Sequence, residues 1–322
     1  MSDHSTNTAL VTGANSGLGF EAAAQLAEMG YGRVTVACRS QEKADTAVRE
    51  LVERTGANVF ETLVVDVASI ESSRKAASEL ASRSRSFDVV LLNAGMVPSR
   101  LDRTTDGIEM CFAASLIGHH IITTTLLDAD LVDGASIVLV GSEAANNDLP
   151  RAMGMSVYDF VLGESSEFGS PASEAMRSFA TASAGPGYNG QRQYSTTKAF
   201  SSWWSAAMTR KHDGSTRFYT VSPGANMGTN AARHSEGAFK FMIAFMSRFG
   251  RFVGMDQPIA DGASRYLDVA HNVGGAYETG RTYTSKPKKM TGPLVVCEQA
   301  HLTNHDRQDT ALDVITALTE SN

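Results

Sequence analysis

The chain has 322 residues, of which 42% are hydrophobic and 28 are glycine. Its net charge of −7 argues against a nucleic-acid-binding protein, which needs a concentrated basic surface. Three widely spaced cysteines form neither a disulfide framework nor a zinc signature, and no signal peptide or apolar run of transmembrane length is evident. These features predict a cytoplasmic protein with no nucleic-acid partner and no transmembrane segment.

Short apolar runs alternate with longer segments of helical composition through the first 222 residues. The runs are rich in valine, leucine and isoleucine, as is typical of parallel strands covered on both faces. The expected strands are Ala9–Thr12, Arg33–Cys38, Val59–Asp66, Phe87–Asn93, Ala135–Ser142 and Arg217–Ser222. The expected helices are Leu18–Met29, Gln41–Arg54, Ser69–Ser82, Asp106–Leu127 and Gln193–Lys211. The alternation predicts an α/β fold: a single Rossmann-type domain over residues 1–322, with a doubly wound parallel sheet of about seven strands and helices on both faces.

Three segments depart from this alternation. The insertion at 146–190 is rich in glycine, serine and alanine, yet it holds enough apolar residues to predict short helices and partial order. In a substrate-loop or lid region at 225–256, phenylalanines and methionines recur at helical spacing. This spacing fits a core-facing helix, a lid over an apolar pocket or a helix at a membrane surface. The C-terminal extension at 286–322 is expected to pack on the domain, with a helix near Asp306–Thr319.

The sequence TGANSGLG at Thr12–Gly19 directly follows an expected strand and opens an expected helix. In this context Gly13 permits a tight turn, Gly17 lets backbone N–H groups approach a pyrophosphate, and Gly19 allows close packing of the helix on the strand. The helix N-terminus adds N–H donors and partial positive charge. The dinucleotide contacts predicted in this loop are Gly13, Asn15, Ser16, Gly17, Leu18 and Gly19.

The second expected strand leads into Cys38, Arg39 and Ser40, about 20 residues after the glycine loop. An NAD site needs a carboxylate here for the ribose 2′-hydroxyl, whereas an arginine suits a 2′-phosphate. Cys38 occupies the acidic position and Arg39 follows it. The sequence therefore predicts NADP(H) rather than NAD(H) as the cofactor, with Arg39 on its 2′-phosphate.

Further motifs follow in an order that gives the chain a family resemblance. They are VDV at Val65–Val67, NAG at Asn93–Gly95, Ser142 at a strand end, YSTTK at Tyr194–Lys198, and Pro223-Gly224. With the glycine loop, they make the chain resemble the short-chain dehydrogenase/reductase superfamily over roughly residues 8–285. The cofactor contacts that this resemblance implies are Asp66 and Val67 at the adenine, Asn93, Ala94 and Gly95 along the sheet edge, and Pro223, Gly224 and Thr229 at the nicotinamide amide.

Tyr194 and Lys198 are four residues apart on an expected helix, so they share one face. A neighbouring ammonium favours the phenolate and lowers the tyrosine pKa from its usual value of about 10. Tyr194 is therefore predicted to donate a proton to a carbonyl oxygen, or to remove it in the reverse reaction. Ser142 is expected to hydrogen-bond the same oxygen from the carboxyl end of its strand. The resemblance implies that Tyr194 and Lys198 also contact the cofactor, with Lys198 at the nicotinamide ribose.

The ACR segment at Ala37–Arg39, the long insertion and the Phe-rich segment are similar to the retinol-dehydrogenase and protochlorophyllide-reductase branch. Ser115 stands where many members carry the asparagine of a catalytic tetrad, and it is included among the predicted catalytic residues. Ala225 stands where protochlorophyllide enzymes generally carry a cysteine. The insertion adjoins the helix that many relatives use for dimerisation, and a monomer or a dimer is expected.

These residues favour an NADP(H)-dependent oxidoreductase that transfers hydride between NADPH and the carbonyl or alcohol of an apolar small molecule. Two alternatives stay open: reduction of a carbon–carbon double bond on the same scaffold, and a catalytically weak NADP-binding regulatory protein. The adjacent His119 and His120 diverge by about 100° on a helix, so no metal site is predicted. Peripheral membrane contact is compatible with the basic, apolar 225–256 region.

Overall fold

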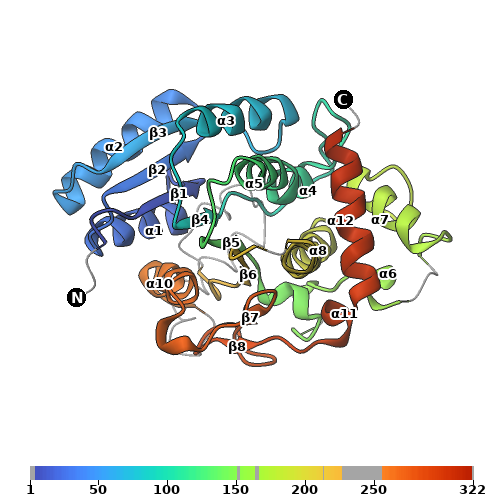
Figure 1. Cartoon of the computed structure of the whole chain (residues 1–322). Coiled ribbons are helices and arrows are strands. Elements are labelled where there is room, and N and C mark those ends of the chain that lie inside the picture. Colours follow the sequence, from blue (N-terminus) through green and yellow to red (C-terminus); the bar gives the residue numbers. More distant parts are fainter. Residues whose placement is uncertain (1–3, 151–152, 164–166, 213, 227–255, 321–322) are drawn as a thin grey trace.

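The structure, a computed structural model of the chain, describes all residues except 1–3, 151–152, 164–166, 213, 227–255 and 321–322 (Figure 1). Its strands are β1 (Thr8–Thr12), β2 (Arg33–Cys38), β3 (Phe60–Val64), β4 (Val89–Leu92), β5 (Ser136–Val140), β6 (Arg217–Val221), β7 (Thr282–Thr284) and β8 (Val295–Val296). They form one sheet in the order β3-β2-β1-β4-β5-β6-β7-β8. All neighbours are parallel except β7 and β8. The predicted doubly wound parallel sheet is confirmed, and the antiparallel β8 is one strand more than expected.

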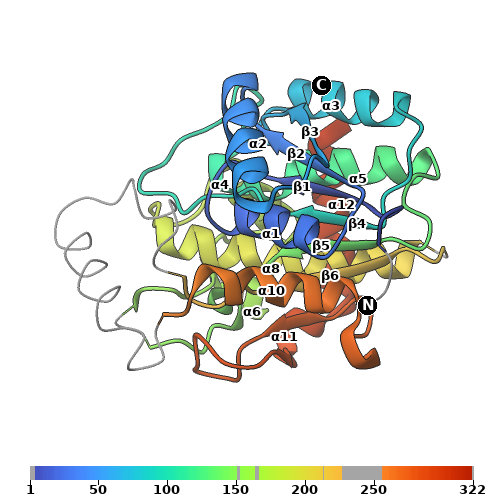
Figure 2. The ribbon, with the colours of Figure 1, turned by 90° about the vertical axis from the view of Figure 1, so that its left-hand side faces the viewer.

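Helices cover both faces of this sheet, as predicted. They are α1 (Gly17–Glu28), α2 (Gln41–Thr55), α3 (Ile70–Ser82), α4 (Met110–Phe112), α5 (Gly118–Asp128), α6 (Asp159–Leu162), α7 (Ala172–Thr181), α8 (Gly190–Lys211), α10 (Ile259–Ala270), α11 (Ala300–Thr303) and α12 (His305–Glu320), with 3-10 turns η2 (Glu143–Asn146) and η6 (Val273–Gly275). One core lies under α1, α2 and α10, and a second lies under α3, α5 and α8. Figures 1 and 2 both show α1 and α10 side by side on their face of the sheet.

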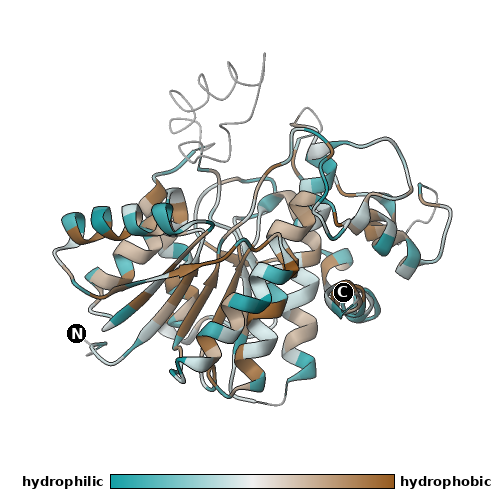
Figure 3. Ribbon diagram, turned by 90° about the horizontal axis from the view of Figure 1, so that it is seen from above, coloured by the Kyte–Doolittle hydropathy of each residue, from teal (hydrophilic) through white to brown (hydrophobic). Residues whose placement is uncertain are grey.

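Strand β5 illustrates why the apolar runs are continuous. Side chains of a strand alternate between the two faces of its sheet. Ile137 and Leu139 belong to the core under α5 and α8, whereas Val138 and Val140 belong to the core under α1 and α10. Because both faces are covered, both sets must be apolar. Figure 3 shows the brown strands enclosed by helices that carry teal on their outer sides.

The central helix differs from the expected Asp106–Leu127. Glu109 caps the amino end of α4 by accepting the Phe112 N–H at 2.8 Å, and a π-helical turn at Ala113–Ile117 then precedes α5. The run Met110–Asp128 is long and apolar enough to cross a membrane by length and composition, so the expectation that no segment reaches this length was wrong. Its most apolar stretch is 72% buried inside the molecule, and in this fold the run is a core helix.

Gly118 lies at the closest approach of α5 to the loop after β3. Its N–H donates to Val67 O at 3.0 Å, and a Cβ at position 118 would lie 2.6 Å from Val67 Cα, with Ser73 Oγ closer still. We expect Gly118→Ala to lower the free energy of unfolding by about 1–3 kcal/mol, because overpacking forces the helix off this loop. Denaturant unfolding measures the change, with Gly187→Ala, which has open space around its Cβ position, as the control. Unchanged stability of Gly118→Ala would contradict the close packing.

An aromatic cluster packs the described part of the insertion against α8. The Phe179 ring lies 5.5 Å from the Phe200 ring of α8, and the Phe160 ring lies 5.7 Å from Phe179. Arg192, at the start of α8, donates two hydrogen bonds to the carboxylate of Glu167, at 2.6 and 2.9 Å. The short helices α6 and α7 are thereby part of the core beside α8.

The C-terminal extension ends in α12, which lies along α8 and beside α7 (Figure 1). Arg210 of α8 forms an ion pair with Asp309 of α12 at 2.6 Å. Trp203 of α8 donates its indole N–H to His301 O at 2.9 Å. Residues 195–208 of α8 are consequently buried on every side.

Candidate active site

The glycine loop between β1 and α1 has the backbone shape that its glycines predict. Gly13 and Gly17 have φ angles of 66° and 59°, in the left-handed region that favours glycine. A Cβ on Gly19 would lie 2.5 Å from Asn93 Nδ2 and 2.6 Å from Gly13 O. Ser16 caps α1 without a side-chain hydrogen bond, which leaves the first N–H groups of α1 to an anion. The loop fits a dinucleotide pyrophosphate.

The hydroxyl of Thr12 joins this loop to the rest of the site. It accepts the N–H groups of Asn93 at 2.8 Å and Ala94 at 3.0 Å. With both lone pairs engaged, it donates its proton to His119 Nε2, 3.0 Å away. His119 then carries its own proton on Nδ1 and donates it to Ser115 O at 2.9 Å. Burial lowers the pKa of His119 to about 4, so the ring is neutral at pH 7.

The residues predicted at the adenosine half lie after the neighbouring strands β2 and β3. Arg39 is exposed directly after β2, and the side chain of Ser40 caps the amino end of α2. Asp66 follows β3, where its N–H donates to Ser72 Oγ at 2.9 Å. Val67 is buried beneath it at 6% exposure. The structure therefore brings Arg39 and Asp66 to one edge of the sheet.

The remaining predicted loop residues, Asn15 and Leu18, face different surroundings. Asn15 is exposed on the loop. Leu18 turns toward α10, where a Cβ on Gly262 would lie 2.8 Å from Leu18 Cδ2. The start of α1 is thus packed against α10 beside the glycine loop.

Ser142, Tyr194 and Lys198 meet at the carboxyl end of β5. Tyr194 and Lys198 lie one turn apart on α8, with Lys198 Nζ 5.7 Å from the centre of the tyrosine ring. Ser142 hydrogen-bonds Tyr194 and accepts the N–H of Ala144 at 3.2 Å. Lys198 Nζ donates to Val140 O at 2.7 Å. These contacts place the hydroxyls of Ser142 and Tyr194 side by side.

Burial dominates the electrostatics of these residues. It raises the pKa of Tyr194 to about 12, although the hydrogen bond to Ser142 acts in the opposite direction. It lowers the pKa of Lys198 to about 8. The expected lowering of the Tyr194 pKa was wrong for the protein alone, because desolvation of the phenolate outweighs any favourable contact.

Ser115 and Lys198 approach each other across Gly95. A Cβ on Gly95 would lie 3.4 Å from Ser115 Oγ and 3.9 Å from Lys198 Nζ. Ser115 lies in the π-helical turn, is 1% exposed, and has no nitrogen or oxygen partner for its hydroxyl among the described residues. The structure therefore brings Ser115 close to the centre formed by Ser142, Tyr194 and Lys198, as its place in the sequence pattern predicts.

Sequence reasoning missed two neighbours of this centre, His119 and Cys111. Their only signal is spacing, since they stand four residues after and before Ser115. The Cys111 thiol donates to Met96 O at 3.2 Å, and burial raises its pKa. It is one of the titratable groups near Tyr194.

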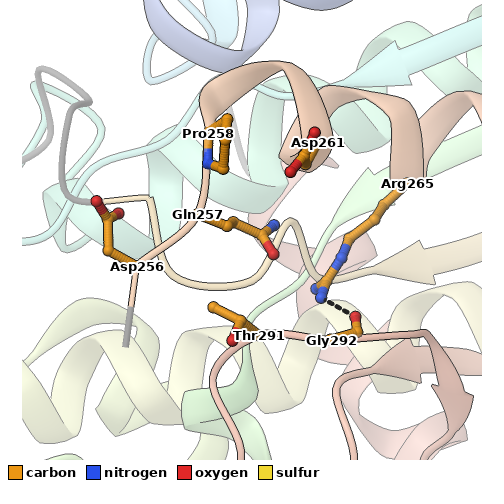
Figure 4. A pocket seen from close by; sticks show the side chains of 7 residues that line it. All are labelled: Asp256, Gln257, Pro258, Asp261, Arg265, Thr291 and Gly292. Carbon is orange, nitrogen blue, oxygen red and sulfur yellow. Dashed lines mark hydrogen bonds between the residues drawn. The ribbon is translucent and has the colours of Figure 1, made fainter. Parts of the chain in front are cut away.

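Pro223 and Gly224 follow β6 beside a pocket of about 480 Å³ (Figure 4). Gly224 has a φ of 75°, and a Cβ there would lie 2.7 Å from Arg265 Nη1 and 2.9 Å from Gln257 Nε2. The pocket is lined by Asp256, Gln257, Pro258, Asp261, Arg265, Thr291 and Gly292. Sequence reasoning assigned no role to Arg265. Thr229 and most of the 225–256 region lie outside the described residues.

Comparison with protein families agrees with this geometry. Residues 7–158 match the short chain dehydrogenase family. This segment of the chain is similar to the short-chain dehydrogenases. The match covers the glycine loop, the Asn93–Gly95 motif and Ser142, and it ends before Tyr194 and Lys198.

Curated relatives come from the branch that the sequence resembles. Human retinol dehydrogenase 13 is 35% identical over 121 residues, which are 38% of this chain and 36% of the relative. Mouse retinol dehydrogenase 11 is 35% identical over 44% of this chain and 45% of its own length. Protochlorophyllide reductase of Chlamydomonas reinhardtii is 33% identical over 44% and 36%. The matches span less than half the length of these relatives.

Solved structures share the fold at low sequence identity. An uncharacterised protein from Mycobacterium paratuberculosis has a TM-score of 0.69 at 19% identity, over 99% of this chain and 95% of its own. A short chain dehydrogenase from Burkholderia cenocepacia, solved in complex with NADP, has a TM-score of 0.56 at 20% identity over 82% and 90%. The fold therefore extends beyond the segment that matches by sequence.

Proposed function

We propose that this protein is an NADP(H)-dependent oxidoreductase that transfers hydride between NADPH and the carbonyl or alcohol of an apolar small molecule. The observation that carries the proposal is the meeting of Ser142, Tyr194 and Lys198 at the carboxyl end of β5. Ligands of open parallel sheets bind at this edge. The glycine loop at the same edge offers a fitting place for the cofactor pyrophosphate.

NADPH, when bound at this edge, would supply a hydride for the carbonyl carbon of the substrate. Ser142 and Tyr194 hold the carbonyl oxygen between their hydroxyls, and Tyr194 donates its proton as negative charge develops there. A Tyr194 pKa of about 12 keeps the phenol protonated and ready to donate at neutral pH. The Lys198 ammonium then stabilises the phenolate that remains. In the oxidation direction, the phenolate takes the proton from the alcohol.

Each part of the cofactor has residues suited to hold it. The N–H groups at the start of α1 would bind the pyrophosphate, and the exposed Arg39 would bind the 2′-phosphate. Lys198 would bind the nicotinamide ribose, as the family resemblance implies. The remaining contacts are Asp66 and Val67 at the adenine, Asn93, Ala94 and Gly95 along the edge, and Pro223 with Gly224 at the nicotinamide.

Replacement of Arg39 by leucine tests the choice of cofactor. Loss of one charge-assisted contact to a phosphate is expected to weaken NADPH binding about 10- to 100-fold and to leave NADH binding unchanged. Fluorescence titration of both nucleotides measures this difference. Arg49→Leu, at an exposed arginine of α2, is the matched control. Tighter binding of NADH than NADPH by the unaltered protein contradicts the assignment.

NADPH consumption with a panel of apolar aldehydes, ketones and enones tests the reaction. Consumption with aldehydes or ketones supports carbonyl reduction. Consumption restricted to enones favours the second candidate, double-bond reduction, which the similarity to protochlorophyllide reductase supports. Cofactor binding without consumption favours a regulatory protein, and the serine at the tetrad position supports that reading.

We further propose that the protein is a monomer and that it is located in the cytoplasm. α12 covers α8, the helix that the family resemblance associates with dimerisation. The three cysteines are free and buried, which suits a reducing compartment. Elution of the purified protein as a dimer in size-exclusion chromatography contradicts the monomer.

A further inference from the structure

A buried carboxylate lies directly after Ser142. Glu143 begins η2 and is 4% exposed. Its Oε2 accepts the hydroxyl of Ser222 at 2.5 Å, and its Oε1 accepts the N–H and the hydroxyl of Ser285 at 3.1 and 2.9 Å. Ser222 follows β6 and Ser285 follows β7, and β5, β6 and β7 are neighbours. Glu143 therefore joins the carboxyl ends of three adjacent strands.

Arg265 brings the opposite charge to this point from α10. It is 7% exposed, and its Nη1 lies 3.6 Å from Glu143 Oε1. Its guanidinium donates to Ser222 O at 3.3 Å and to Ser285 Oγ at 3.2 Å. Figure 4 shows its hydrogen bond to Gly292 O at the wall of the pocket. Both charges of the pair are thus held by the same strand ends.

Stability gives little reason for such a pair. Desolvation of two buried charges offsets most of their attraction, and apolar residues of similar size often do as well. The location of the pair beside the catalytic residues gives a stronger reason for its presence. Ser142 is the residue before Glu143, and the Gly224 N–H donates to Ser222 Oγ at 3.1 Å. The two segments that flank the reacting groups are fixed by the pair.

We propose that Glu143 and Arg265 are a positioning pair for the catalytic centre, which holds Ser142 and the Pro223-Gly224 segment in place and balances its two charges beside Tyr194. The inference rests on the proposed function in treating Tyr194 as the acid–base group.

The balance of charge concerns Tyr194 directly. The Glu143 carboxylate raises the pKa of Tyr194, in the same direction as burial. Arg265 offsets that carboxylate. The titratable groups that face Tyr194 or Glu143 from the surrounding elements are Cys111, Lys198, Tyr266, Arg265 and Cys297. Loss of either member leaves the other charge uncompensated, so the two losses move the ionisation of Tyr194 in opposite directions.

Fluorine NMR of the full chain with a polyfluorinated tyrosine at position 194 tests this pair, because it reports ionisation of that phenol without turnover. Relative to the same labelled protein without substitutions, E143Q is expected to lower the pH midpoint of the Tyr194 titration and R265M to raise it. Each shift is expected to be about half a pH unit or more. The double variant is expected to return close to the starting midpoint. Shifts in the same direction, or none, overturn the proposal.

Lys211 and Asp313 provide the matched control. They form an exposed ion pair at the far end of α8, with N···O of 2.8 Å, roughly 25 Å along the helix from Tyr194. K211M and D313N are expected to leave the midpoint unchanged.

Conservative variants keep the proposal testable if a single variant does not fold. E143D and R265K keep both charges while changing the hydrogen-bond geometry. They are expected to keep the midpoint and to lower kcat about 10-fold. Wild-type kcat in both overturns the positioning role. Full activity of an unlabelled Tyr194→Phe variant would instead refute the proposed function. The fluorine titration would still test the charge effect of Glu143 and Arg265, because it does not depend on turnover.

Discussion

Tyr194→Phe is expected to lower kcat about 100- to 10,000-fold, the usual contribution of a general acid, while NADPH affinity changes little. The substitution removes one hydroxyl and keeps the ring, whose centre lies 5.7 Å from Lys198 Nζ. The carbonyl oxygen then keeps Ser142 but loses its proton donor. Steady-state NADPH consumption with an active carbonyl substrate measures kcat, and fluorescence titration measures cofactor binding.

Tyr277→Phe is the matched control for this loss. Tyr277 packs its ring 5.0 Å from Tyr283 and precedes β7, at the sheet edge opposite the candidate site. Its variant is expected to keep wild-type kcat. Turnover that survives in Tyr194→Phe refutes the proton-donor role and leaves the regulatory reading or a different donor.

The sequence predicts the parts of this molecule that depend on local pattern. All six expected strands occur. All but β3 are buried along nearly their whole length, and strands covered on both faces need mostly apolar side chains. The glycine loop has its predicted shape, since Gly13 and Gly17 adopt φ values that other residues rarely reach. Tyr194 and Lys198 share a helix face because residues four apart in an α-helix lie on the same side.

The remaining features depend on residues that are distant in sequence. Glu143 and Arg265 have no shared motif, and only the convergence of β5, β6, β7 and α10 brings them together. The π-helical turn at Ala113–Ile117 has the same composition as an α-helix, so periodicity cannot distinguish the two. The pKa of Tyr194 was predicted from one neighbour, whereas desolvation by the whole surrounding structure determines it.

The position of the insertion shows how the two kinds of information combine. Its apolar residues predict short helices, but not where these helices lie. In the structure Phe160 and Phe179 pack on Phe200, in the middle of α8, while Tyr188 and Gln193 both donate to the buried carboxylate of Glu109 at 2.9 Å. The insertion is therefore anchored to the helix that carries Tyr194, which makes it a candidate wall for the substrate.

Lys198→Met is expected to abolish most turnover and, at about pH 7, to make the folded protein about 1–3 kcal/mol more stable. The ammonium of Lys198 is buried at 5% exposure, and its pKa falls from 10.5 to about 8 on folding. Below the folded pKa the charge is carried in the interior and its cost is fully present. Between about pH 8 and 10.5 the unfolded chain binds more protons than the folded one, so the wild type gains stability as pH rises and the difference from Lys198→Met shrinks.

Denaturant unfolding of both proteins across this range measures the stability difference, with Lys211→Met, at the exposed end of the same helix, as the control. A Lys198→Met variant that is less stable than the wild type at about pH 7 would show that the hydrogen bond to Val140 O outweighs the buried charge.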